Sequence, residues 1–257
     1  MSAAVLLVLG LSLGLLLASA RRAQRLARLE IEFVAGVSHE LRTPLAVIRS
    51  AGENLADGVV SNESQLRRYG SLIRDESRRL SEMVEQILSF AGLAAGSRRY
   101  DLQPITVDDV VARALEACRT ELAACGCQVV TEIDLETPPV LAEATSLAYA
   151  VRNLITNAVK HGGANEPIRV GAARAGSGGE VQLTVEDHGP GMDPADLPYV
   201  FDAFYRGSRA VADQTHGTGL GLTLVKRIVE AHGGRVEASN RPEGGARFTM
   251  WLPAQAA

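Results

Sequence analysis

The chain has 257 residues, of which 46% are hydrophobic and 22% charged, so most of it is predicted to be globular rather than disordered. This length exceeds one typical domain and accommodates a membrane segment with two compact domains. A formal net charge of −4 argues against a nucleic-acid partner, because a basic stripe is expected for that function.

The N-terminal segment has the composition of a membrane span. Residues 3–20 carry no charged side chain and are rich in Leu, Val and Ala. As a helix with a rise of about 1.5 Å per residue, this segment spans roughly 27 Å, just enough for the hydrocarbon core of a bilayer. Four arginines follow at once, which by the positive-inside rule places the downstream chain in the cytoplasm: Arg21, Arg22, Arg25 and Arg28. We therefore predict a single-pass transmembrane helix at residues 1–20, in the inner (cytoplasmic) membrane.

A cleaved signal peptide is the alternative interpretation of the same segment. Ala18-Ser19-Ala20 resembles a small-residue cleavage site, but a basic region before the apolar stretch is missing. Almost nothing precedes the span, so we expect no extracellular sensor domain in this chain. A separate sensor protein in the membrane could supply that function.

Two amphipathic helices are predicted next, beginning with a juxtamembrane helical stalk at residues 21–32. Residues 21 to about 57 carry one apolar stripe at three- and four-residue steps, and residues 66–90 carry a second. Turn-forming residues at 57–62 join the two helices, which predicts an antiparallel hairpin. Because one hairpin cannot bury both stripes, we predict a homodimer in which two hairpins form a four-helix bundle.

A small-residue and basic linker separates this dimerisation domain, predicted at residues 33–95, from a second domain at residues 100–254. Thr106 followed by Asp109 resembles a helix-capping box with Asp in place of Glu, which predicts a helix to about Ala124. Further helices are predicted at residues 143–160 and 220–232, and strands at residues 129–133, 168–172, 181–185, 235–238 and 246–252. This mixture, with antiparallel hairpins at the end, predicts an α/β two-layer sandwich rather than a doubly wound sheet.

The three cysteines are Cys118, Cys125 and Cys127. Their spacing is uneven and no histidine lies nearby, so they make a poor set of zinc ligands. In a cytoplasmic domain we expect them to be reduced thiols.

The segment from Phe33 to Leu45 carries the chemistry of the first domain. His39 lies on the opposite side of the helical wheel from the apolar stripe and is expected to face solvent. An imidazole with a pKa of about 6.5 is mostly neutral in the cytoplasm, so one ring nitrogen is free to attack a phosphoryl group. Glu40 could accept the proton from the other nitrogen, and Thr43, one turn on, could hold a water. Pro44 inside the helix costs about 3 kcal/mol and predicts a kink, although an exposed helical histidine alone is a weak sign of function.

Residues 153–161 predict a helix with a polar face that suits a phosphate and its metal ion. Asn153, Asn157 and Lys160 recur at four- and three-residue steps and so share one face. Asn carbonyl oxygens are hard ligands suited to Mg²⁺, and a lysine suits a phosphate. From this segment alone, an ordinary solvated helix face is the simpler interpretation.

Asp187 follows a predicted strand and begins the segment Asp187-His188-Gly189-Pro190-Gly191-Met192. A carboxylate at a strand end can accept a hydrogen bond from an adenine amino group, and glycines allow a ligand to approach the backbone closely. An ordinary Asp/Gly/Pro turn is the alternative at this point.

Two further segments flank a polar loop at residues 208–216 that could act as a mobile lid. Before it lie two phenylalanines three residues apart, Phe201 and Phe204, which singly are more often core residues. After it, the glycines of residues 217–222 open the next helix and expose backbone N–H groups, a ready anion site. This loop follows no strand and lacks a GK[ST] ending, so it is neither a dinucleotide fingerprint nor a P-loop.

Taken in order, these five segments resemble the sequence boxes of sensor histidine kinases. Residues 33–45 are similar to the H box, whose usual form is close to F-x-x-x-x-S-H-E-L-R-T-P-L, and the other four resemble the N, G1, F and G2 boxes of the ATP domain. The resemblance covers about residues 30–253 and includes the usual family ending from Gly244 to Pro253. It implies the Bergerat-type (GHKL) ATPase fold that is shared with gyrase, the Hsp90 chaperone and MutL.

The resemblance implies a role for each matching residue. It makes His39 the phosphoacceptor, Glu40 the assisting base and Thr43 a helper in phosphatase activity. It makes Asn157 the Mg²⁺ ligand and Asp187 the carboxylate that reads adenine. It places Asn153, Lys160 and Arg206 at the phosphates and makes Gly189 and Gly191 shape the pocket. It also implies that ATP is bound by the loop of Gly217, Thr218, Gly219, Leu220 and Gly221, whose glycines would cradle the phosphates and hinge the lid.

The implied activity is that of an ATP-dependent protein-histidine kinase, tethered to the membrane, which phosphorylates His39 from ATP and Mg²⁺. The phosphoryl group would pass to an aspartate in the receiver domain of a separate response regulator, which the kinase would also dephosphorylate. A mechanical ATPase would not need the His39 segment, and a pseudokinase should show damage at Asn157, Asp187 or the loop from Gly217. None is seen. Residues 21–32 are too few for a HAMP-like module, and without a sensor domain the sequence does not indicate the stimulus. A signal would reach His39 as a shift or tilt of the first helix, helped by the kink at Pro44.

Overall fold

The computed structural model describes residues 36–38, 40–59, 62–94, 100–162, 166–176, 179–212 and 219–255. The chain divides into two compact units, Met1–Met83 and Val84–Ala257. The predicted transmembrane helix at residues 1–20, the predicted stalk at residues 21–32 and His39 lie outside the described residues. Within the described part of the chain, no helix is both long enough and apolar enough to cross a membrane.

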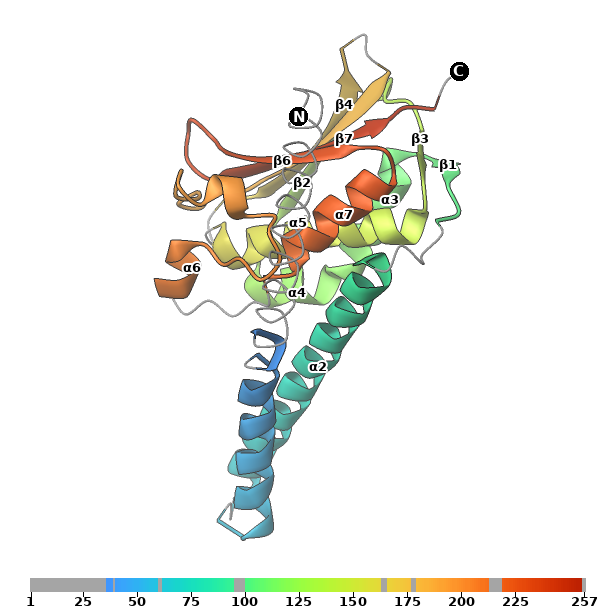
Figure 1. The fold of residues 1–257 in the computed structure, drawn as a ribbon. Helices are drawn as coiled ribbons and strands as arrows, with labels where there is room; N and C mark the ends of the chain where they lie inside the picture. Colours follow the sequence, from blue (N-terminus) through green and yellow to red (C-terminus); the bar gives the residue numbers. More distant parts are fainter. Residues whose placement is uncertain are drawn as a thin grey trace, which may run out of the picture. The chain divides into compact units, whose positions relative to one another are not determined.

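The first unit contains a helical hairpin (Figure 1). Residues 40–56 are helical, and α2 follows at Glu63–Ala94, continuing past the end of this unit. Gly58 permits the turn between them, because its φ of +67° is a left-handed conformation that glycine adopts without steric cost. Asn62 caps α2 through its Oδ1, which accepts the Gln65 N–H at 2.8 Å. The predicted pair of helices joined by a short turn is therefore confirmed.

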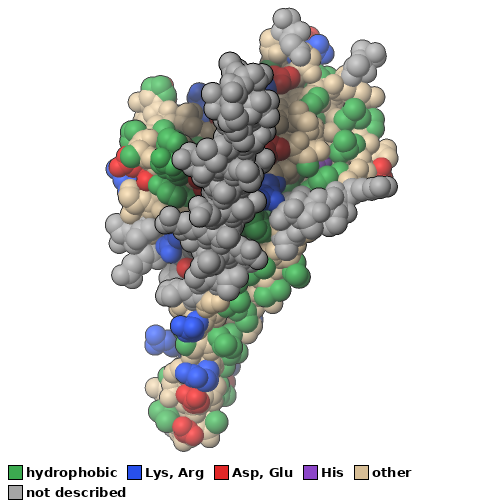
Figure 2. Space-filling model, viewed as in Figure 1, with side chains coloured by type: hydrophobic (Ala, Val, Ile, Leu, Met, Phe, Trp, Pro, Cys, Tyr) green, Lys and Arg blue, Asp and Glu red, His purple; other side chains and the backbone are tan. Residues whose placement is uncertain are grey.

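The hairpin leaves apolar side chains uncovered. Leu45 and Leu66, one from each predicted stripe, are 58% and 55% exposed, whereas Ala51 and Met83 are buried. Figure 2 shows hydrophobic side chains among charged ones on the hairpin surface. A single chain therefore does not bury both stripes, which is what half of a larger helical bundle would leave exposed.

The second unit is built on a five-stranded mixed sheet. Its strands lie in the order β2-β4-β5-β7-β6, with β2 parallel to β4 and every other neighbouring pair antiparallel. The strands are β2 (Val129–Ile133), β4 (Ile168–Ala175), β5 (Glu180–Glu186), β6 (Arg235–Asn240) and β7 (Ala246–Pro253). Each of them includes one of the five strands that the alternation of apolar residues predicts.

Helices cover one face of this sheet and complete a two-layer α/β sandwich (Figure 1). They include α3 (Val107–Ala117), α5 (Ala144–His161) and α7 (Gly221–Ala231). Alternate residues of β5 are buried against them, namely Val181, Leu183 and Val185. Leu154 and Ile155 of α5 are fully buried in the same core, and burying a side chain of this size contributes about 1.5–3 kcal/mol. The predicted sandwich is confirmed, and its core fixes α5 against the sheet.

The helix predicted from Thr106 to about Ala124 is wrong in its length. Its N-cap is as predicted, because the Thr106 hydroxyl accepts the Asp109 N–H at 3.2 Å. Cys118, however, adopts a non-helical conformation (φ −95°, ψ 0°) that separates α3 from a short α4 (Arg119–Cys125). Cys118 is fully buried at this break, an effect of tertiary packing that helical periodicity does not reveal.

Four short elements have no counterpart in the sequence prediction. They are β1 (Gln103–Ile105), β3 (Val140–Ala142), the 3₁₀ turn η1 (Leu197–Tyr199) and α6 (Ser208–Ala212). β1 and β3 pair with each other in a separate antiparallel sheet. Segments of three to five residues are too short to show a periodic pattern, so periodicity could not predict them.

The expectation of three reduced thiols is wrong for two of them. Cys125 and Cys127 form a disulfide across Gly126, whose left-handed φ of +68° turns the chain back so that the two sulfurs meet. Cys118 is a free thiol, and burial raises its pKa to about 11. This thiol therefore stays protonated and unreactive at neutral pH.

Candidate functional site

Helix α5 carries the first set of predicted site residues on one face. Asn153 is 5% exposed, and its Nδ2 donates to the Tyr149 carbonyl at 2.9 Å, a bond within the helix that fixes the side chain. Asn157 is half-buried and Lys160 is exposed, so this face runs from the core to the surface. Two carboxamides and an ammonium on one helix face suit a polyanion and its cation.

Asp187 lies directly after β5, with its side chain buried at the edge of the helical layer. Its Oδ1 accepts two backbone N–H groups, from Gly189 at 2.9 Å and from Ala246 at 3.0 Å. Within the described part of the chain, Oδ2 makes no hydrogen bond. One oxygen therefore orients the carboxylate, and the other can accept a hydrogen bond from a ligand.

Glycine is required where the Asp187 segment meets the C-terminal end of α5. A Cβ at Gly189 would overlap the carbonyl oxygen of His161, and a Cβ at Gly162 would lie 2.8 Å from the Cβ of Asp187. Gly191 has a φ of +69°, which glycine adopts without strain. Gly189 thus allows the close approach between this loop and α5, whereas Gly191 faces Asn240 and Gly245 of the turn between β6 and β7.

The loop before α7 lies against the same helix. A Cβ at Gly221 would lie 3.2 Å from the Asn153 Oδ1, so the start of α7 contacts the predicted phosphate face of α5. Gly219 has a φ of +68° and its carbonyl accepts the Phe204 N–H at 3.0 Å. Leu220 is fully buried, so only its backbone can face a ligand. Gly217 and Thr218 lie outside the described residues.

The two phenylalanines have different surroundings. Phe201 contacts Phe248 of β7 edge-on, with ring centroids 6.5 Å apart, as a core residue does. Phe204 has a φ of +65°, a conformation that costs a residue with a side chain about 1–3 kcal/mol. A Cβ at Gly219 would lie 2.6 Å from the Phe204 carbonyl carbon, so the strained Phe204 backbone packs directly on the glycine loop.

Arg206 lies between Phe204 and α6. Its Nη2 donates to the Ala210 carbonyl at 3.4 Å, and its side chain is partly exposed. The predicted lid at residues 208–216 begins with α6, and its residues 213–216 lie outside the described residues. The contact with Ala210 ties Arg206 to the lid segment, and its predicted contact with a phosphate stays a prediction.

The phosphoacceptor segment belongs to the first unit. The Glu40 carboxylate lies 3.8 Å from the Arg79 guanidinium of α2, with both side chains about one-quarter exposed. Thr43 is exposed on the helix and Pro44 is buried within it. Glu40 and Thr43 therefore lie in the described helix that follows position 39, with Glu40 in an ion pair that the sequence analysis did not predict.

Two family models match the chain. One, described as the His Kinase A (phospho-acceptor) domain, matches residues 29–96. The other, described as the histidine kinase-, DNA gyrase B- and HSP90-like ATPase, matches residues 142–256. The chain belongs to the sensor histidine kinase family.

Known relatives of this histidine kinase align over most of its length. It is 36% identical over 232 residues to the signal transduction histidine-protein kinase AfsQ2 of Streptomyces coelicolor, with 86% of this chain and 41% of AfsQ2 covered. The solved structure of AdeS, a histidine kinase of Acinetobacter baumannii, is 25% identical with a TM-score of 0.67, covering 85% of this chain and 98% of AdeS. Full-length ShkA in complex with AMPPNP is 28% identical with a TM-score of 0.63, covering 87% of this chain and 46% of ShkA. The chain spans about half the length of the curated relatives that it matches.

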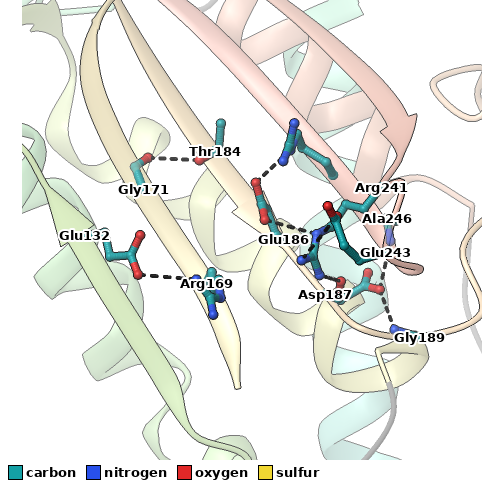
Figure 3. A network of polar contacts seen from close by, with 11 residues as sticks. Glu132, Arg169, Gly171, Thr184, Glu186, Asp187, Gly189, Arg241, Glu243 and Ala246 are labelled. Atoms are coloured by element: carbon teal, nitrogen blue, oxygen red, sulfur yellow. Dashed lines mark hydrogen bonds and ion pairs between the residues drawn. The ribbon is translucent and has the colours of Figure 1, made fainter. Parts of the chain in front are cut away.

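A network of charged residues supports the Asp187 segment of this histidine kinase, and the sequence analysis missed it (Figure 3). The Arg241 Nη1 donates to the Asp187 carbonyl at 2.8 Å, and its Nε lies 3.2 Å from the Glu186 carboxylate as an ion pair. Arg247 donates to the other oxygen of Glu186 at 2.6 Å. These arginines follow Asp187 by more than fifty positions, so no local pattern connects them with it.

A buried carboxylate in the following segment was also missed. The Asp196 Oδ1 accepts the Tyr205 hydroxyl at 2.6 Å, and its Oδ2 accepts the backbone N–H and the hydroxyl of Ser208 at 2.8 and 2.9 Å. The hydrogen bond from Tyr205 is the largest cause of a lowered pKa of Asp196. This carboxylate ties the segment before the phenylalanines to the first residue of α6.

Proposed function

We propose that this histidine kinase transfers the γ-phosphoryl group of ATP to its own His39 and then to an aspartate of a separate response regulator. The observation that carries the proposal is the set of segments gathered around α5. The start of α7 lies against Asn153, in the middle of that helix, and the Asp187 segment lies against its C-terminal end. We assign ATP binding to residues 100–254 and phosphotransfer to residues 33–95.

The base end of the nucleotide would lie at Asp187. Oδ1 is held by two backbone N–H groups, and within the described residues Oδ2 has no hydrogen-bond donor. Adenine presents a 6-amino donor, whereas guanine and hypoxanthine present a 6-carbonyl acceptor that a carboxylate repels. This chemistry supports a preference for ATP over other purine triphosphates.

The phosphate end would lie between α5 and the start of α7. Lys160 would contact a phosphate, and the backbone N–H groups of Gly219, Leu220 and Gly221 lie at a helix N-terminus, where the helix dipole favours an anion. Asn157 fits Mg²⁺, because it offers a half-buried, hard carboxamide oxygen and a nucleotide-bound Mg²⁺ needs few protein ligands. When bound, the ion would neutralise charge on the phosphates.

The phosphoryl group would move to a ring nitrogen of neutral His39. The new N–P bond forms as the bond from the γ-phosphorus to the bridging oxygen breaks, and ADP leaves. Glu40 would accept the proton from the other ring nitrogen, with Arg79 orienting the carboxylate. The receiver aspartate would take the phosphoryl group next, and Thr43 would orient a water for its later hydrolysis.

Two hairpins would form the dimeric bundle, and residues 1–20 would tether it to the inner membrane. The exposed leucines of the hairpin support the dimer, and the uncharged residues 3–20 support the tether. The tether predicts that the full chain stays in the membrane fraction after an alkaline carbonate wash, whereas a chain lacking residues 1–20 is released. Release of both chains would remove the tether from the proposal.

Autophosphorylation is the direct test of the activity. The full chain in detergent is incubated with γ-labelled ATP and Mg²⁺, beside His39→Gln and Asn157→Ala variants. We expect label that is acid-labile and base-stable on the parent, which is the signature of phosphohistidine, and none on either variant.

Each outcome bears on a separate part of the proposal. Label that survives in His39→Gln would overturn the phosphoacceptor, and label that survives in Asn157→Ala would overturn the metal ligand. A parent that binds ATP without acquiring label would overturn autophosphorylation by the chain on its own.

A further inference from the structure

The turn between β6 and β7, residues 240–245, folds back onto the Asp187 segment. The Asn240 carboxamide takes both backbone groups of Met192, because its Oδ1 accepts the N–H at 2.8 Å and its Nδ2 donates to the carbonyl at 2.7 Å. Gly191 leaves the room for this contact, since a Cβ there would lie 2.8 Å from the Asn240 Oδ1. The Asn240 side chain thus fixes the Met192 end of the loop that runs from Asp187 to Met192.

Arg241 fixes the Asp187 end of the same loop. Its guanidinium donates to the Asp187 carbonyl at 2.8 Å and pairs with Glu186 at 3.2 Å, with its side chain only 9% exposed. In Figure 3 the Arg241 side chain reaches the strand end where Glu186 and Asp187 lie. The Arg241 N–H donates to the Gly245 carbonyl at 2.9 Å, which closes the turn that carries the arginine.

The carbonyl and the carboxylate of Asp187 are therefore held from the same hairpin. Ala246, next to the turn, donates to Oδ1, and Arg241 donates to the main-chain oxygen of the same residue. Because both the main-chain carbonyl and the Oδ1 of Asp187 are held by hydrogen bonds, the direction of its Oδ2 is fixed as well. A guanidinium suits this task, because its planar fork can serve a carboxylate and a carbonyl together, which a lysine ammonium cannot do with the same geometry.

We propose that Asn240 and Arg241 are positioning residues for nucleotide recognition, which hold Asp187 in the orientation that selects adenine. The inference rests on the proposed binding of ATP and extends it to the specificity of that site. The two residues act through Asp187 and Met192 and need no contact with the base. The Arg241 side chain is buried in its contacts, whereas the exposed ion pairs elsewhere on the surface contribute little to stability.

Arg241→Met tests this role, because it removes the donors and the charge while keeping an unbranched chain. We expect the Kd of the full-length protein for ATP to rise about tenfold, because the hydrogen bond from the adenine amino group to the Asp187 Oδ2 is no longer well aligned. The ratio of the affinities for ATP and inosine triphosphate should fall, because a mobile Oδ2 no longer distinguishes an amino group from a carbonyl. The KM for ATP should rise with little change in kcat, because the γ-phosphate lies at the other end of the nucleotide.

Arg235→Met is the matched control. Arg235 begins β6, the strand that ends just before Arg241. It pairs with Glu180 and stacks on the Trp251 ring at 4.5 Å, so it is an arginine in an ion pair on the same sheet. It lies at the end of β6 away from residue 240, and we expect its replacement to leave the affinity ratio unchanged. Arg241→Lys should recover folding stability through Glu186 but not the affinity ratio.

Asp187→Asn distinguishes adenine recognition by Asp187 from the positioning of Asp187 by Arg241 and Asn240. If Asp187→Asn leaves the affinity ratio unchanged, adenine recognition by Asp187 is wrong and the inference fails with it. If Asp187→Asn lowers the ratio while Arg241→Met and Asn240→Ala both keep it, only the positioning role is overturned. A lowered melting temperature in Arg241→Met with an unchanged ratio in the folded protein would likewise show a structural role alone.

Discussion

At the scale of single residues, the Asp196 carboxylate connects its own segment with Tyr205 and with the first residue of α6 through short hydrogen bonds. Tyr205 and Ser208 both donate to it, and these bonds lower the pKa of Asp196. The same bond to Asp196 is the largest cause that raises the pKa of Tyr205 to about 12 from an ordinary value of 10.0. The ionised carboxylate and the protonated phenol stabilise each other, so stability should depend on pH at both extremes.

Tyr205→Phe removes this bond and predicts a pH-dependent loss of stability. Near neutral pH the phenol is protonated and Asp196 is ionised, so the bond contributes fully. As the pH rises toward about 12, the unfolded chain releases the proton first, and the contribution is lost. In acid it is lost when Asp196 becomes protonated, below its lowered pKa. Denaturation midpoints should therefore differ most between parent and variant near neutral pH and converge in strong base and strong acid.

Tyr199→Phe is the control for this measurement. The Tyr199 ring lies 5.6 Å from that of Tyr205 and is half exposed, so it samples the same surface. Its replacement should lower the midpoint less than that of Tyr205 near neutral pH. A difference between parent and Tyr205→Phe that stays constant from neutral to strongly basic pH would contradict the coupling.

At the scale of elements, the periodic pattern of apolar residues predicted those helices and strands that pack one face on the core. The five strands of the sheet and helices α5 and α7 follow apolar periodicity, because each has one face on the core. Periodicity failed at Cys118, where a buried side chain interrupts an otherwise helical segment. It also failed at β1 and β3, whose pairing joins residues far apart in the sequence.

The residues of the candidate site also fall into two groups, those that a local sequence pattern predicts and those that it does not. The glycines and polar residues of the motifs could be found from sequence, because they lie in short runs with a chemical pattern. The contacts of Arg241 and Asn240 with the Asp187 segment could not, since they depend on the pairing of β7, in the terminal hairpin, with β5, which lies more than fifty positions earlier in the chain. The ion pair of Glu40 with Arg79 likewise joins two helices through the hairpin.

The N-cap of α3 gives a prediction at this scale. The Thr106 hydroxyl accepts the Asp109 N–H, which would otherwise have no partner within the helix. Thr106→Ala should destabilise the protein by about 1 kcal/mol in urea denaturation, and Thr106→Ser, which keeps the hydroxyl, by much less. Equal losses in the two variants would mean that the methyl group, and not the cap, stabilises this end of α3.

At the scale of the whole molecule, the two units leave different surfaces. The α/β unit has one extended apolar core, whereas the hairpin keeps leucines such as Leu45 and Leu66 more than half exposed. An apolar surface of leucines left exposed along two predicted helical stripes is typical of a helix–helix interface. A four-helix bundle made from two chains would cover it.

Leu66→Glu should therefore weaken the dimer. A leucine buried in a bundle contributes about 2 kcal/mol, and a symmetric dimer loses that contribution twice, so dissociation should become at least a hundredfold easier. Sedimentation of the full chain in detergent over a range of concentrations measures the shift from dimer to monomer.

Leu135→Glu is the matched control for that change. Leu135 is fully exposed in the turn after β2, outside the hairpin, so the same substitution there adds the same charge without touching the proposed interface. We expect this variant to sediment like the parent. If Leu66→Glu also sediments like the parent, the second stripe does not form the interface at that position, and the exposed leucines of the hairpin must serve a different partner. If both variants dissociate, added negative charge rather than the loss of buried leucine is the cause, and the bundle loses its support from this surface.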